Sequence, residues 1–146
     1  TYTCAVKADG TLWCWGSNGC GQLGDGTTQD KSSPVQVLAL GTSAVAVAAG
    51  CDYTCAVKAD GTLWCWGYNY YGQLGDGTTQ DKSLPVEVKA LGKTVAAVAV
   101  GERHTCAVKT GGTLWCWGYN GTGQLGDGTT QDKTSPVQVM ALGGCK

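Results

Sequence analysis

The chain repeats itself with a period of 51 residues, and this repeat limits the folds open to it more than any other feature. The segment TLWCWG begins at Thr11, at Thr62 and again at Thr113. Each copy carries TCAVK before this segment, and GQLGDGTTQDK and PV-x-V-x-ALG after it. A period of about 50 residues, built from short apolar runs between glycine-rich turns, is typical of propeller blades. We therefore predict an all-β chain made of β-propeller blades.

Each copy offers about four antiparallel strands. The candidates are TCAVK, TLWCW, PVQV with its equivalents, and an Ala/Val run such as residues 45–49 or 95–100. No segment keeps a helical apolar period over three turns, so we expect no long helix. The blade repeats are 1–50, 51–101 and 102–146; the first lacks its Ala/Val strand and the third is truncated. Propellers close with about four to eight blades, so we expect an incomplete propeller segment, or one completed by oligomerisation.

The turn between the first two strands of each copy predicts how six cysteines pair. Residues 7–11 read KADGT, which suits a three-residue hairpin loop with its glycine in the left-handed conformation. Cys4 then lies opposite Cys14 at a non-hydrogen-bonded position, where the distance suits a disulfide. A two-residue loop would instead place Cys14 opposite Ala5. The same count in every copy predicts the disulfides Cys4–Cys14, Cys55–Cys65 and Cys106–Cys116.

The tryptophans flank these cysteines on the opposite face of the strand. Side chains alternate along a strand, so Trp13 and Trp15 share a face with Ala5 and Thr3. Large side chains beside small ones can fill the gap between stacked blades. An aromatic box around a ligand is the alternative; we favour packing.

Composition and motifs argue against several functional classes. The net charge is −1 and 14% of residues are charged, so no basic face predicts a nucleic-acid partner. The longest apolar stretch, near residues 44–49, is too short to cross a bilayer. His104 is the single histidine and no CxxC occurs, so we expect no metal site and no cofactor. No nucleophile and base stand at a recognisable spacing, so we predict that the chain is not an enzyme.

The aspartates of the DGTTQD segment are the remaining candidates for metal chemistry. Asp25 and Asp30 could offer oxygens to calcium, but their spacing differs from that of the known calcium loop. We interpret them as turn residues whose side chains bond the local backbone. Asn120 begins a sequon, Asn-Gly-Thr, of the form that accepts a glycan.

The sequence TCAVKADGTLWCWGYNYYGQLGDGTT, followed by a Pro-Val strand, resembles the repeats of the regulator of chromosome condensation family. The resemblance covers the whole chain and is nearest to the cysteine-paired repeats of secreted and cell-surface bacterial proteins. It implies a β-propeller, usually seven-bladed, that serves as a scaffold for protein binding. The namesake is an exchange factor for a small GTPase and contacts chromatin; no exchange loop and no basic tail can be matched here. Bacterial relatives include inhibitors of secreted enzymes, which keeps inhibition or exchange-factor-like activity as a distant alternative.

Three cysteines fall outside the blade pattern. Cys20 and Cys51 lie in loops of adjacent repeats and are candidates for an inter-blade disulfide. Cys145 is then left over near the end of the sequence. An odd cysteine in an oxidised protein suggests an intermolecular disulfide; a free thiol is the alternative.

Positions that differ between near-identical copies are candidates for binding. Tyrosine supplies a large contact area at low entropic cost, so the tyrosines of the variable loops are candidate anchors, with neutral drift as the alternative. The candidate binding residues are Tyr68, Tyr70, Tyr71, Tyr119, Arg103 and His104.

The sequence therefore predicts a non-enzymatic scaffold. Three cystines in a short chain indicate a secreted, extracellular or cell-surface location. Three blades leave two open ends, so we expect structural self-assembly: copies of the chain, or further repeats of a longer one, joining head to tail into a ring or filament. The alternative is a propeller module that presents its variable loops to another protein or to a glycan, without membrane insertion.

Overall fold

The computed structural model describes residues 1–140, and these residues are all-β, as predicted. Two short 3-10 helices interrupt the strands, η1 at Leu38–Leu40 and η2 at Lys89–Leu91. The strands are β1 (Tyr2–Val6), β2 (Leu12–Gly16), β3 (Lys31–Gln36), β4 (Ala44–Ala49), β5 (Tyr53–Lys58), β6 (Leu63–Gly67), β7 (Lys82–Glu87), β8 (Val95–Val100), β9 (His104–Lys109), β10 (Leu114–Gly118) and β11 (Lys133–Gln138).

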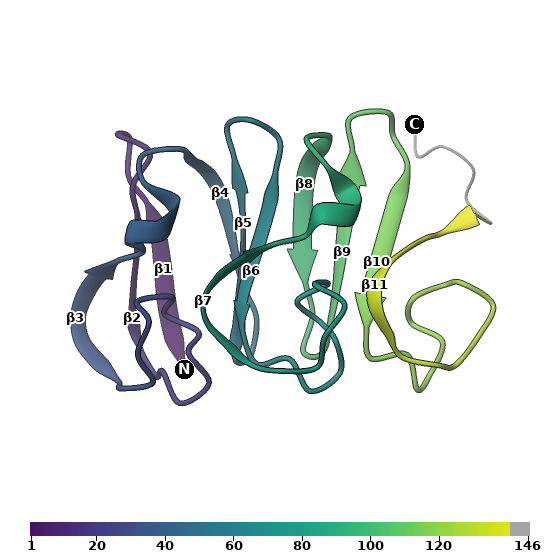
Figure 1. Cartoon of the computed structure of the whole chain (residues 1–146), viewed down its shortest axis with the longest axis horizontal. Coiled ribbons are helices and arrows are strands. Elements are labelled where there is room, and N and C mark those ends of the chain that lie inside the picture. Colours follow the sequence, from purple (N-terminus) through teal and green to yellow (C-terminus); the bar gives the residue numbers. More distant parts are fainter. Residues whose placement is uncertain (141–146) are drawn as a thin grey trace.

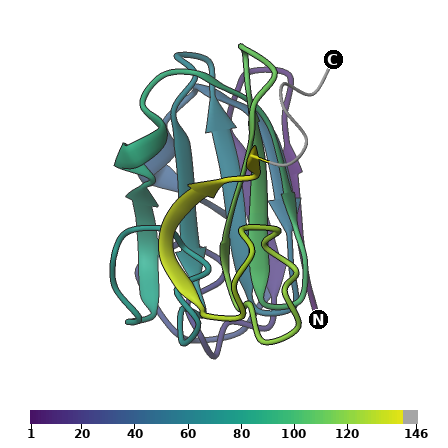
Figure 2. The same cartoon turned by 90° about the vertical axis from the view of Figure 1, so that its right-hand side faces the viewer.

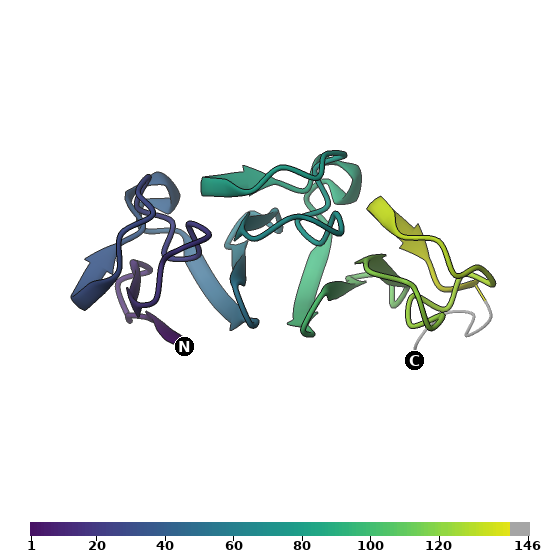
Figure 3. The ribbon, with the colours of Figure 1, turned by 90° about the horizontal axis from the view of Figure 1, so that it is seen from below.

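The strands form three antiparallel sheets whose boundaries are offset from the sequence repeat (Figure 1). The orders are β1-β2-β3, β4-β5-β6-β7 and β8-β9-β10-β11. The Ala/Val strand of one repeat thus pairs with the TCAVK strand of the next, which leaves three strands in the first sheet. Seen from below, the sheets follow one another along an arc, with β4 and β8 on one side and β3, β7 and β11 on the other (Figure 3). This is the arrangement of propeller blades.

The hairpin register is the predicted one. Cys4 pairs with Cys14 and Val6 with Leu12 in the first sheet. Lys7 N–H donates to the Thr11 carbonyl at 2.9 Å across the turn, and Gly10 has a φ of 83°. Glycine at this position adopts the left-handed conformation without the steric cost that a Cβ adds. The three-residue loop, and not the two-residue alternative, is therefore present.

The third strand begins earlier than the PV motif predicts. β3 runs from Lys31 to Gln36 and includes Pro34 in its middle. Proline is tolerated there because β3 is an edge strand, whose outward N–H groups need no ladder partner. Helix η1 follows and buries Leu40.

The cystine face of one sheet packs against the tryptophan face of the next. One core cluster combines Leu12, Cys14 and Leu23 of the first sheet and its loop with Ala56 and Trp66 of the second. A second cluster joins the second and third sheets through the corresponding residues, including Trp117. Figure 2 looks along the stack from the third sheet. Trp66 and Trp117 are fully buried, so packing between blades holds for both.

Candidate functional site

We call the contact between two neighbouring sheets a seam. Besides its apolar core, the first seam contains a set of hydrogen bonds around one backbone carbonyl. The carbonyl of Gln22 accepts a hydrogen bond from Thr54 Oγ1 at 2.7 Å and from Trp66 Nε1 at 2.9 Å. Tyr2 reaches across from β1 and donates its hydroxyl proton to the Tyr53 carbonyl. All these groups are buried, so each polar atom needs its partner. The hydrogen bonds therefore favour one arrangement of the two sheets, in addition to the apolar packing.

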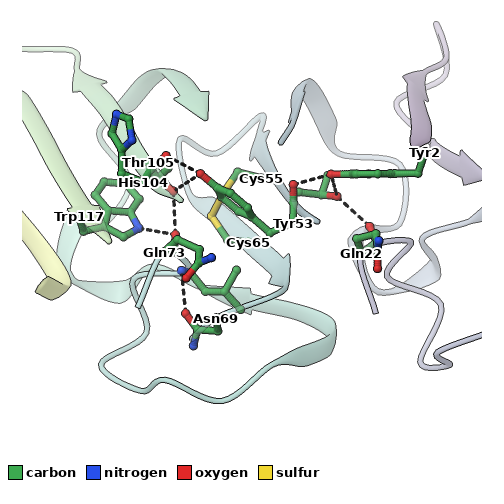
Figure 4. The surroundings of a disulfide bond; sticks show 12 residues. Tyr2, Gln22, Tyr53, Cys55, Cys65, Asn69, Gln73, His104, Thr105 and Trp117 are labelled. Carbon is green, nitrogen blue, oxygen red and sulfur yellow. Dashed lines mark hydrogen bonds between the residues drawn. A yellow bond between two sulfur atoms is a disulfide. The ribbon is translucent and has the colours of Figure 1, made fainter. Parts of the chain in front are cut away.

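The second seam repeats this chemistry (Figure 4). The Gln73 carbonyl accepts from Thr105 Oγ1 at 2.7 Å and from Trp117 Nε1 at 2.9 Å. Tyr53 donates to the His104 carbonyl. Burial raises the pKa of the Tyr53 hydroxyl well above its usual range, so it stays protonated and able to donate.

A glycine gives each tryptophan room to reach its carbonyl. A Cβ on Gly75 would lie 2.6 Å from Nε1 of Trp117, and one on Gly24 would lie 2.6 Å from Nε1 of Trp66. Both glycines also have positive φ angles, 73° and 75° respectively. The GQLG motif shared by all copies is therefore the seat for the tryptophan of the neighbouring blade, a role that the sequence analysis missed.

The first sheet carries an unused copy of the tryptophan half of the seam. Thr3 and Trp15 stand one repeat before Thr54 and Trp66. Thr3 is exposed and Trp15 half-buried, and neither side chain makes a hydrogen bond with a described residue. We call Thr3 and Trp15 the donor face.

The third sheet carries an unused copy of the other half. Gln124 is half-buried, whereas Gln22 and Gln73 are buried. Gly126 is exposed, and the atom nearest to a Cβ built on it is Cγ1 of Val139 at 3.2 Å, with no tryptophan beside it among residues 1–140. We call Gln124 and Gly126 the acceptor face.

Four tyrosines gather on one rim of the stack. The ring centroids of Tyr70 and Tyr71 are 5.0 Å apart, and those of Tyr71 and Tyr119 are also 5.0 Å apart. Tyr68 stacks on Tyr70 with centroids 6.5 Å apart. Arg103 lies over the Tyr71 ring, its guanidinium carbon 5.4 Å from the centroid. We call these five residues the tyrosine surface; Tyr70 is its most exposed tyrosine, at 66%.

The sixth candidate binding residue, His104, lies elsewhere. It is the first residue of strand β9. Its carbonyl accepts the Tyr53 hydroxyl, and its ring lies beside Gly101, so its place is in the second seam.

Hydrogen bonds of Asn69 and Asp76 hold the loop after β6, which bears three of the four tyrosines. The buried Asn69 side chain donates to the carbonyls of Thr78 at 3.0 Å and Gln80 at 2.9 Å, and accepts from Leu74 N–H at 3.0 Å. Asp76 accepts from the N–H of Thr78 at 3.0 Å. Within the described part of the chain, no group of three or more His, Cys, Asp or Glu side chains is placed to hold a metal ion.

The equivalent loops repeat this network. Asn18 and Asp25 make it in the first repeat, where Asp30 accepts from the N–H of Asn18 at 2.8 Å. Asn120 makes it in the third and is fully buried, so its amide nitrogen has a structural role. These aspartates and asparagines are turn residues.

The cysteines fall into three groups. The structure joins Cys4 to Cys14, Cys55 to Cys65 and Cys106 to Cys116, with Cα atoms 4.1 Å apart in every pair. Cys20 and Cys51 are free thiols that line one pocket, so a bond between them stays a prediction. Cys145 lies outside the described residues, so its intermolecular bond stays a prediction.

The chain matches one family over nearly its whole length. The regulator of chromosome condensation (RCC1) repeat model matches residues 9–57, 60–108 and 111–146, and a second RCC1 repeat model matches residues 44–73 and 95–124. In residues 1–140 no helix has the length and apolar character needed to span a membrane.

Relatives share the repeats but are much longer. The chain is 39% identical to the ultraviolet-B receptor UVR8 of Arabidopsis thaliana over 140 residues, covering 94% of this chain and 32% of the receptor. It is 36% identical to the human E3 ubiquitin-protein ligase HERC2 over 146 residues, covering 99% of this chain and 3% of the ligase. The chain thus spans at most a third of these relatives.

Solved structures share the fold. The crystal structure of human WBSCR16 matches with a TM-score of 0.82 and 28% identity, over 94% of this chain and 35% of that one. Prp20p of Saccharomyces cerevisiae, a protein described by its binding to Gsp1p and histones, matches with a TM-score of 0.81 and 24% identity, over 94% and 36%. The likeness to Prp20p shows the fold alone.

Proposed function

We propose, from the premise that this chain belongs to the RCC1 repeat family, that it is a non-enzymatic propeller scaffold whose end faces bind further blades of the same type. The match to the ligase HERC2 covers the repeats and a small part of that protein, so the relationship supports a scaffold role and not ligase chemistry. Those blades belong to a second copy of this chain or to further repeats of a longer one.

The observation that carries the proposal is that the two end faces are the separated halves of one seam. Thr3 and Trp15 are donors of the kind that Thr54 and Trp66 use on the Gln22 carbonyl. Gln124 and Gly126 stand where Gln73 and Gly75 stand one seam earlier. Because donor and acceptor faces differ, they join head to tail, and such contacts build rings or filaments.

Sedimentation velocity over a wide concentration range tests this proposal. We expect the wild-type chain to associate and W15A to weaken the association by about tenfold or more, as loss of a buried interface tryptophan does. L38A is the matched control, because Leu38 is 75% exposed on η1 and belongs to neither face. A wild-type chain that stays monomeric, or an L38A chain as impaired as W15A, would refute the proposal.

The tyrosine surface supports a second candidate function, the binding of another protein. Tyrosines in mutual contact, one of them exposed and three half-buried, offer a large, rigid area, and Arg103 adds charge at its edge. Aromatic residues and arginine are the residue types enriched at protein-binding hot spots. That Prp20p is described by its binding to Gsp1p and histones supports protein binding by this fold, though not those partners for this chain.

A peptide display library provides a probe for this second function. Peptides selected on the wild-type chain are expected to lose about tenfold or more in affinity for a Y70A/Y71A double variant. K58A is the control, since Lys58 ends β5 and lies over the Trp64 ring. Figure 1 shows the turn between β5 and β6 at the opposite end of the sheet from the loop between β6 and β7. Selected peptides that bind the double variant as tightly as the wild type would show that the tyrosine surface is not the site.

The blade cystines support a secreted or cell-surface location for the protein. Structural disulfides persist in oxidising compartments and are rare in the cytosol. We expect reduction potentials below about −300 mV, which resist the glutathione pool. Blade cystines that open fully in a cytosolic glutathione buffer would contradict this location.

A further inference from the structure

Two free thiols from neighbouring sheets share one pocket at the rim of the first seam. Cys20 lies in the loop after β2 and is half-buried, whereas Cys51 precedes β5 and is exposed. The rest of the pocket lining is Asp52, Tyr68, Tyr71, Glu102 and Arg103. Neither thiol belongs to the blade cystines, and the end faces do not use them.

Hydrogen bonds tie the two thiol-bearing loops together. The N–H of Cys20 donates to Oε1 of Gln22 at 2.9 Å. Nε2 of the same Gln22 lies 3.4 Å from Oδ1 of Asp52, the residue after Cys51. The Gln22 side chain therefore spans the seam between the loops and limits how far the thiols can separate.

The second seam shows what the same two positions do one repeat later. Tyr71 corresponds to Cys20, and Glu102 and Arg103 correspond to Cys51 and Asp52. There Nη1 of Arg103 lies 3.5 Å from the Tyr71 hydroxyl, and the guanidinium covers the Tyr71 ring. Side chains thus bridge the rim of the second seam without a covalent bond. The bridging Arg103 occupies the position of Asp52, which is next to Cys51.

We propose that Cys20 and Cys51 are a reversible thiol pair that forms a disulfide across the first seam. The bond would link the first and second sheets at the rim, as the Arg103–Tyr71 contact links the second and third. It closes a loop between the first and second sheets and so removes conformations from the unfolded chain only. It also changes one wall of the pocket that borders the tyrosine surface.

The chemistry balances with a small-molecule disulfide such as oxidised glutathione as the oxidant. Cys51 is the more exposed thiol, and its thiolate attacks the oxidant, giving a mixed disulfide and one glutathione thiol. Burial, with Asp81 and Asp52 nearby, raises the pKa of the Cys20 thiol, so Cys20 is the slower nucleophile. Its thiolate then attacks the Cys51 sulfur and releases the second glutathione thiol. Two protein thiols are oxidised as one glutathione disulfide is reduced.

Mass spectrometry of the whole chain tests this pairing. The protein is equilibrated in glutathione buffers of stepped ratio, its remaining thiols are alkylated, and it is digested without reductant. We expect a peptide pair joining Cys20 to Cys51, with an intact mass about 2 Da below that of the dithiol. The pair should persist in C145S and vanish in C51S. Two alkylated thiols, or glutathione adducts alone, at the most oxidising ratio would overturn the proposal.

A thiol pair moved to the second seam tests whether the position at the rim of a seam is what brings two thiols together. Y71C/E102C, made in a chain with C20S, C51S and C145S, moves the thiols to the same places on the second seam. If the seam brings the thiols together, this pair also closes within one molecule. An intermolecular product from the native or the transplanted pair would contradict the proposal.

Discussion

The same residue has different roles in different repeats because its neighbours differ. Thr54 is fully buried and its hydroxyl donates to the Gln22 carbonyl at 2.7 Å, whereas Thr3, one repeat earlier, is exposed and unpartnered among the described residues. The chain therefore contains its own control for the energy of one seam hydrogen bond.

We expect T54V to lower the free energy of unfolding by about 1–3 kcal/mol, because the buried Gln22 carbonyl loses a donor. T3V should change it by less than about 0.5 kcal/mol at concentrations where the chain is monomeric, because Thr3 is then exposed. Urea denaturation of both variants measures the difference. Equal losses in the two variants would mean that the seam bond contributes nothing.

The buried Tyr2 hydroxyl should make the free energy of unfolding depend on pH in the alkaline range. Burial raises its pKa to about 12, above the value of about 10 in an unfolded chain. Because the folded state holds the proton more tightly, the contribution of Tyr2 to stability is complete below about pH 10 and is lost as the pH rises toward about 12.

The measurement is the free energy of unfolding at stepped alkaline pH for the wild type and Y2F. Y2F, which has no proton to lose there, should show a shallower decline. Parallel curves would place the alkaline sensitivity in other groups.

At the scale of elements, each hairpin is closed by its turn and by its cystine. Cys55 and Cys65 are fully buried and opposite each other in β5 and β6. Chain-entropy arguments give about 3 kcal/mol for closing a loop of this length. The C55A/C65A variant should therefore lose about that much stability to urea under oxidising conditions, while added reductant should affect it less than the wild type. An unchanged free energy of unfolding would contradict this.

The glycine seat gives a second prediction at this scale. G75A places a Cβ 2.6 Å from Nε1 of Trp117, whereas G126A meets no tryptophan among the described residues. Both positions have positive φ, 73° and 69°, so the backbone strain of alanine is shared. We expect G75A to be destabilised by at least about 1 kcal/mol more than G126A in thermal unfolding. Equal melting temperatures of the two variants would mean that the room for Trp117 beside Gly75 does not contribute to stability.

Sequence patterns predicted the strands and the register because turn chemistry and alternation are local. The glycine of KADGT determines the turn, and the turn alone places Cys4 opposite Cys14 without any contact from another sheet. The seam bonds could not be predicted this way, because the Gln22 backbone carbonyl carries no sequence signal of its acceptor role. The shared GQLG motif was the available clue, and it indicated only a turn.

At the scale of the whole molecule, the repeat predicted the stack but not which residues would stay exposed. Trp15 and Trp66 stand in identical TLWCWG segments, yet among residues 1–140 only Trp66 has a neighbouring carbonyl to bond. The burial of this tryptophan depends on whether another blade precedes its own. The clustering of four tyrosines with Arg103 likewise depends on three loops meeting in space: the loop after β6, the loop before β9 and the loop after β10.

The most direct test of head-to-tail joining is a mixing experiment in sedimentation velocity. W15A loses the tryptophan of the donor face but keeps an intact acceptor face. G126A loses the room for a tryptophan on the acceptor face but keeps an intact donor face. Each variant alone should therefore be monomeric, and an equimolar mixture should form a one-to-one dimer that grows no further. A mixture that stays monomeric while the wild type associates, or either variant associating alone as the wild type does, would contradict the account.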